Sequence, residues 1–114
     1  MVACGASTGR YGLGNSKHTI HALGRTSGAM SGAPLRKRAL EVVRRVHERA
    51  QGTYPIIGCG GISTADDALA MLEAGASLVQ VSTEYIYGGG DSIRNMRAGL
   101  NERLRKAQQR QTTK

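Results

Sequence analysis

The chain has 114 residues, a length typical of one domain, and a formal net charge of +8. It contains no Trp or Phe and 39% hydrophobic residues, so its core has to be aliphatic. No apolar run approaches the roughly 18 residues of a membrane-spanning helix, and the glycine-rich start is unlike a signal or transit peptide. Two cysteines, Cys4 and Cys59, lie far apart without a paired ligand motif, which favours neither a disulfide nor a metal site.

The positive charge is unevenly distributed. All 16 Lys and Arg residues lie before residue 50 or after residue 93, mostly in two stretches that we expect to be helical. Two basic helices could bind nucleic acid or an anionic membrane surface. We prefer to interpret them as the solvated faces of amphipathic helices, because no aromatic residues are interleaved with the arginines. We therefore expect no nucleic-acid partner.

Residues 1–27 form an irregular, glycine-rich N-terminal segment. Its first residues, Met1–Cys4, have the composition of the end of a strand. His18 and His21 are three residues apart and would share one helical face, but no third ligand lies nearby, so we predict no metal site here.

A helix is predicted from Pro34 to about Ala50. Proline is favoured in the first turn of a helix, and Gly52 provides the stop. Its apolar stripe consists of Ala39, Val43, Val46 and Ala50.

A strand, a helix and a second strand follow. The apolar run Pro55–Cys59 predicts a buried strand, although periodicity alone does not exclude a buried helical segment. Ser63 stands where a helix N-cap is expected, with Asp66 three positions on, and Gly75 ends the helix. The run Leu78–Val81 predicts the second strand. A helical crossover between two strands requires them to be parallel.

The last predicted helix follows Gly88–Gly90, with Asp91 or Ser92 as its cap. Apolar residues recur along it at spacings of three and four: Ile93, Met96, Leu100 and Leu104. A short separate helix is expected just before the glycines. We expect residues 105–114 to form a polar tail that frays beyond Ala107.

The two glycine turns carry the functional signal. Gly60 and Gly61 follow the first strand without side chains, so backbone N–H groups and a helix N-terminus could bind an anion there. Ser82 and Thr83 follow the second strand in the same way. No Lys or Arg occurs between residues 49 and 94, so such a site would use no cationic side chain. The alternative is that these glycines only allow tight turns and close helix–strand packing.

Several blocks in order give the sequence a family resemblance. It resembles the C-terminal part of dihydroorotate dehydrogenase, most closely the quinone-using, membrane-associated class, from about Gly28 to Leu104. The blocks that carry the resemblance are Gly28–Leu35 (GAMSGAPL), Leu40–Arg44 (LEVVR), Pro55–Ser63 (PIIGCGGIS), Asp67–Leu69 (DAL) and Ala74–Gln80 (AGASLVQ).

The resemblance implies an α/β fold: the last two to three βα units of a (β/α)₈ barrel with parallel strands. It implies FMN as the cofactor, with its phosphate held by Ser31, Gly32, Gly60, Gly61, Ser82 and Thr83. The activity implied is oxidation of dihydroorotate to orotate in pyrimidine synthesis, with electrons passed to quinone. No catalytic residue is assigned in this chain, and neither Ser7 nor Lys17 is given the roles of the family's serine base or lysine. Ser82 stands where the family commonly has Tyr, and Cys59 where Val is usual.

We expect residues 28–104 to be the C-terminal βα units of a longer, membrane-associated enzyme, inactive without the remaining barrel strands or another copy of the chain. A (β/α)₈ barrel takes roughly 250 residues. The alternatives are a piece of another flavin- or phosphate-binding barrel, a degenerate half-barrel that pairs with a full-length enzyme, or a small basic protein that binds nucleic acid or membrane surfaces.

Overall fold

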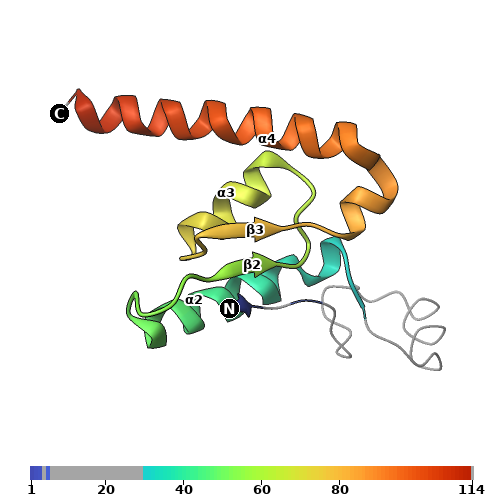
Figure 1. Ribbon diagram of the computed structural model, residues 1–114, viewed down its shortest axis with the longest axis horizontal. Helices are drawn as coiled ribbons and strands as arrows, with labels where there is room; N and C mark the ends of the chain where they lie inside the picture. Colours follow the sequence, from blue (N-terminus) through green and yellow to red (C-terminus); the bar gives the residue numbers. More distant parts are fainter. Residues whose placement is uncertain (4, 6–29, 114) are drawn as a thin grey trace.

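A computed structural model describes residues 1–3, 5 and 30–113 of the chain (Figure 1). The expectations for Cys4, Ser7, Lys17, His18 and His21 lie outside these described residues. The elements are, in order, β1 (Val2–Ala3), the 3₁₀ helix η1 (Ala33–Leu35), α2 (Arg36–Ala50), β2 (Ile57–Cys59), α3 (Ala65–Glu73), β3 (Leu78–Gln80) and α4 (Thr83–Thr112).

The three described strands form one parallel sheet in the order β1-β2-β3. β2 is the central strand, and its Ile57 lies opposite Val2 of β1 on one side and Leu78 of β3 on the other. The predicted α/β class with parallel strands is therefore confirmed. Within the described part of the chain, β1 and β3 each pair with β2 alone, so the sheet is open at both edges.

The first helix ends where the sequence predicts, but α2 begins at Arg36, two residues after the predicted start at Pro34. Pro34 lies in η1, where its missing N–H is not needed, and α2 continues from it. Ala39 and Val43 are fully buried and form the centre of the apolar stripe. At the end of α2 the chain turns through Gln51 and Gly52, both with positive φ, and Gly52 adopts this conformation without strain.

The start of α3 differs from the prediction by one residue. The N-cap is Thr64 rather than Ser63: the Thr64 hydroxyl accepts from the Asp67 N–H, and the Asp67 carboxylate accepts from the Thr64 N–H. This reciprocal pair is a capping box. The same carboxylate also accepts from the Ser63 N–H, so Ser63 lies outside the helix and Asp67, not Asp66, completes the cap.

The two helices predicted at the C-terminus are joined into α4, with a kink at Gly89 (φ 64°, ψ −162°). The cap predicted at Asp91 or Ser92 is therefore wrong, because the helical backbone resumes directly after Gly89. The fraying predicted beyond Ala107 is also wrong, because α4 remains helical to Thr112. A Glu102–Lys106 ion pair at 2.7 Å supports this last part, whose side chains are exposed.

The core lies between the sheet and its helices. α2 packs against β1 and β2, whereas α3 packs against β3 and α4 (Figure 1). The largest fully buried side chains are Leu35, Val43, Ile56 and Met71, and this core is aliphatic, as expected. Gly58 in β2 packs directly on Met71, since a Cβ at residue 58 would lie 2.3 Å from Met71 Cγ. This close packing sets the spacing between α3 and β2 at this point.

No helix in the described part of the chain is both long and apolar enough to cross a membrane.

Candidate anion-binding site

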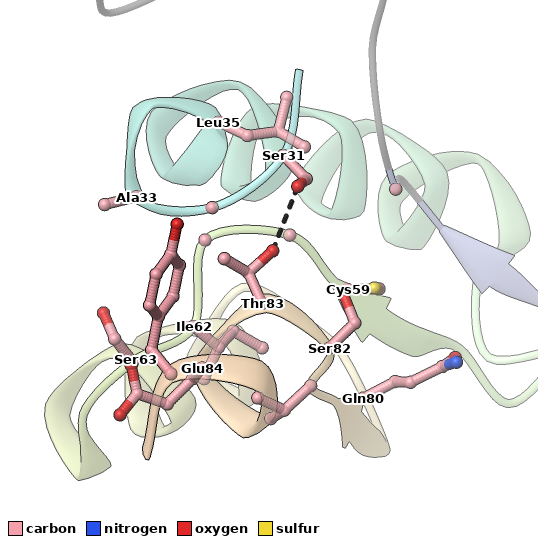
Figure 2. A pocket seen from close by; sticks show the side chains of 16 residues that line it. Ser31, Ala33, Leu35, Cys59, Ile62, Ser63, Gln80, Ser82, Thr83 and Glu84 are labelled. Atoms are coloured by element: carbon pink, nitrogen blue, oxygen red, sulfur yellow. Dashed lines mark hydrogen bonds between the residues drawn. The ribbon is translucent and has the colours of Figure 1, made fainter. Parts of the chain in front are cut away.

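A cavity of about 200 Å³ lies at the carboxyl ends of β2 and β3. Carboxyl ends of neighbouring parallel strands meet at one edge of the sheet, so the turns after β2 and β3 open toward the same space. The segment leading into η1 covers it from the other side (Figure 2). Three pieces of chain that are distant in sequence therefore converge on one cavity.

All the residues predicted to bind the anion line this cavity: Ser31, Gly32, Gly60, Gly61, Ser82 and Thr83. Their convergence depends on the tertiary fold. Sequence reasoning missed Glu84 and Tyr87, which also line it. A signal for Tyr87 was present, since residues four apart share a helical face and Thr83 was already assigned.

The Ser31 segment and the start of α4 are joined directly. The Thr83 hydroxyl donates a hydrogen bond to the Ser31 hydroxyl at 3.0 Å (Figure 2). Gly32, at φ 87°, lies beside Thr83, and a Cβ there would be 3.3 Å from Thr83 Cγ2. The absence of a side chain at Gly32 therefore allows the two segments to approach closely.

The Gly60–Gly61 turn has an unusual backbone that only glycine adopts readily. Both residues have positive φ, 119° and 71°. A Cβ at Gly61 would lie 2.6 Å from the backbone of Arg36, the first residue of α2. Among the described residues, no group accepts a hydrogen bond from the N–H of Gly61 or of Ile62. Within the described part of the chain, these two donors beside the cavity therefore have no acceptor.

The described residues lining the cavity include no Lys, Arg or His. That amides and hydroxyls bind an anion here stays a prediction. The one charged residue among them is Glu84, whose Oε1 accepts a hydrogen bond from the Ser92 hydroxyl across the kink in α4. Elsewhere in the described chain, His, Cys, Asp and Glu never gather in a group of three able to hold a metal ion.

The parallel sheet and its crossover helices define the class of protein: these are βα units of a parallel α/β protein. The Gly60–Gly61 turn lies at the carboxyl end of β2, and Ser82–Thr83 lies at that of β3. The sequence model of the family described as dihydroorotate dehydrogenase matches residues 1–104. The chain belongs to the dihydroorotate dehydrogenase family. The match begins at residue 1, so the resemblance is not limited to the stretch from about Gly28 to Leu104 that the sequence indicated.

Curated relatives carry the name dihydroorotate dehydrogenase (quinone). The chain is 46% identical over 104 residues to that of Thermosynechococcus vestitus, covering 88% of this chain and 28% of the relative. It is 51% identical over 78 residues to that of Synechococcus elongatus, covering 68% of this chain and 21% of the relative. The chain thus spans about a quarter of the length of these relatives.

Solved structures agree with the sequence matches. The chain resembles a ligand-free DHODH of Eimeria tenella with a TM-score of 0.78 and 30% identity, covering 93% of this chain and 28% of that one. A second structure, DHODH from the same organism in complex with ferulenol, gives a TM-score of 0.79 at 28% identity, covering 93% of this chain and 27% of that one. These likenesses place β1 to α4 as consecutive βα units of the family's barrel.

Proposed function

We propose that this chain forms the phosphate-binding end of an FMN site in a dihydroorotate dehydrogenase. The observation that carries the proposal is the convergence of Ser31–Gly32, Gly60–Gly61 and Ser82–Thr83 on one cavity without a cationic side chain. Each segment supplies donors or removes side-chain bulk. A phosphate monoester presents several acceptor oxygens and is suited to such a set of N–H and O–H donors.

The residues present fit a phosphate group in size and chemistry. The N–H groups of Gly61 and Ile62 have no acceptor in the described chain. A Cβ at Gly61 would collide with the Arg36 backbone, and a Cβ at Gly32 would lie only 3.3 Å from Thr83 Cγ2 on a backbone with positive φ, so the close approach of these segments favours glycine. The Ser31 and Thr83 hydroxyls, already 3.0 Å apart, can each rotate to donate to a bound oxygen.

FMN held by these residues would supply the hydride and electron chemistry that oxidises dihydroorotate to orotate with a quinone as the final acceptor. The residues of this chain act on binding and orientation. They hold the terminal phosphate, and thereby fix the position of the rest of the cofactor. We assign no proton-transferring residue among those described. In a longer enzyme of this family we expect association with the membrane that contains the quinone.

The test is a comparison of two flavins with the purified chain. FMN and riboflavin differ only by the phosphate, so riboflavin is a matched control. We expect FMN fluorescence or calorimetric titrations to show binding at least about tenfold tighter than riboflavin, as hydrogen bonds to a charged group imply. Inorganic phosphate should compete with FMN.

Equal affinity for the two flavins, or no binding of either, would contradict the proposal. Tight binding of nucleotides or sugar phosphates in preference to FMN would favour another phosphate-binding barrel.

A further inference from the structure

Arg36 lies at the back of the Gly60–Gly61 turn and is not among the residues that line the cavity. It is the first residue of α2, and its guanidinium reaches the loop between β2 and α3. Its Nε donates to the Gly61 carbonyl at 2.9 Å, and its Nη2 donates to the Ser63 hydroxyl at 3.0 Å. One side chain therefore holds two points of the glycine turn from outside the site.

The guanidinium is itself held in place. Its Nε lies 3.0 Å from Asp67 Oδ1, and the Asp67 side chain is only 12% exposed. The other carboxylate oxygen of Asp67 accepts from the N–H groups of Ser63 and Thr64 at 3.1 and 3.0 Å. Arg36, Asp67 and the turn are thus connected by one ion pair and by charge-assisted hydrogen bonds, which are stronger than neutral ones.

The contact with the Gly61 carbonyl has a consequence for the next N–H. In a planar trans peptide the C=O and N–H point in opposite directions. Because the Gly61 carbonyl points to Arg36, the Ile62 N–H points away from Arg36. No group in the described chain accepts a hydrogen bond from it, and Ile62 lines the cavity. A cation on the carbonyl also polarises the peptide and makes its N–H a better donor.

We propose that Arg36 is a positioning residue for the phosphate site. Its guanidinium fixes the Gly61–Ile62 peptide so that the Ile62 N–H faces a phosphate oxygen, and Arg36 does not itself touch the ligand. This inference rests on the proposed function. The described lining of the site has no basic side chain, and Arg36 would influence phosphate binding only indirectly, through the Gly61–Ile62 peptide.

A simple electrostatic role makes a different prediction. If Arg36 acted only by its charge, any nearby arginine would have a comparable effect. Arg38 is a matched control: it lies on the same helix, its side chain is 39% exposed like that of Arg36, and it pairs with Glu41. Arg38→Ala removes the same charge without touching the glycine turn.

The experiment measures FMN and riboflavin affinity for the full chain and for Arg36→Ala, Arg36→Lys and Arg38→Ala, with circular dichroism of each. We expect Arg36→Ala to weaken FMN binding about tenfold or more while riboflavin affinity changes little, because the loss concerns the phosphate. Arg36→Lys should keep at most part of the wild-type FMN affinity, since an ammonium cannot reproduce the planar guanidinium that reaches both acceptors. Arg38→Ala should change FMN affinity less than about twofold.

Full FMN affinity in Arg36→Ala would overturn the inference, and so would equal losses for Arg36→Ala and Arg38→Ala. If Arg36→Ala does not fold, Arg36→Lys becomes the deciding variant, and wild-type affinity in it would also overturn the inference. A wild-type chain that does not distinguish FMN from riboflavin refutes the proposed function itself, and this inference with it.

Discussion

The Thr83 hydroxyl donates a hydrogen bond to the Ser31 hydroxyl at 3.0 Å, joining two residues that are 52 positions apart. Thr83 is the first residue of α4, and Ser31 precedes η1. The contact closes one side of the cavity at the ends of β2 and β3. It also places two rotatable hydroxyls where a phosphate oxygen could accept from both.

Replacing Thr83 by Val tests this pair. Valine keeps the methyl group that packs beside Gly32 and removes only the hydroxyl. We expect FMN affinity to fall about three- to thirtyfold, because a hydrogen bond to a charged group is lost. Riboflavin affinity should hardly change. The control is Ser77→Ala, an exposed hydroxyl at the opposite end of β3. A Thr83→Val chain with wild-type FMN affinity would remove Thr83 from the phosphate site.

Gly61→Ala should be strongly destabilising. The substitution forces a positive φ of 71° on alanine and places its Cβ 2.6 Å from the Arg36 backbone. Strain and overpacking together should cost about 2–5 kcal/mol in the free energy of unfolding. Gly52→Ala is the matched control, since its φ is 78° but nothing lies within 4 Å of the added Cβ. Gly52→Ala should lower the free energy of unfolding only by the cost of a left-handed backbone conformation, about 1–2 kcal/mol. Similar losses for both, measured by urea unfolding, would contradict the close packing.

The parts of the fold that the sequence predicted are those with local signals. Gly60–Gly61 between an apolar run and a capped helix indicates a strand–turn–helix junction without reference to the rest of the chain. The predicted strand Pro55–Cys59 is observed as Ile57–Cys59, and Leu78–Val81 as Leu78–Gln80. Strand ends differ because pairing with neighbours, which local sequence does not encode, decides where a strand stops.

The parts that were missed depend on long-range contacts or on a choice between equal local patterns. Ser63 with Asp66 and Thr64 with Asp67 both fit a capping pattern, and the contact of Asp67 with Arg36 accompanies the second. Arg36 and Gly61 are 25 residues apart, so their hydrogen bond could not be read from spacing. The helical tail was missed because exposed polar residues leave no amphipathic period to detect.

The last part of α4 should respond to acid. The hydrogen bond and charge of Lys106 hold the pKa of the Glu102 carboxyl below its ordinary value. A lowered folded-state pKa means that the ionised pair favours the helix above the unfolded-state pKa, and this support is lost as pH falls through the folded-state pKa. NMR titration of the Glu102 side chain should show the lowered value. Lys106→Met should raise it, and an unchanged titration would contradict the pairing.

The contact between Met71 and Gly58 predicts a coupled pair of mutations. Met71 is 1% exposed, so Met71→Ala should leave a cavity and cost about 2–5 kcal/mol in the free energy of unfolding. Gly58→Ala should also destabilise, because its Cβ would lie 2.3 Å from Met71 Cγ. In the double variant the new methyl group occupies space that Met71 has left. We expect its loss of stability to be smaller than the sum of the two single losses by about 1 kcal/mol or more. Additive losses in urea unfolding would show that the two side chains do not share this space, and that the spacing between α3 and β2 has another origin.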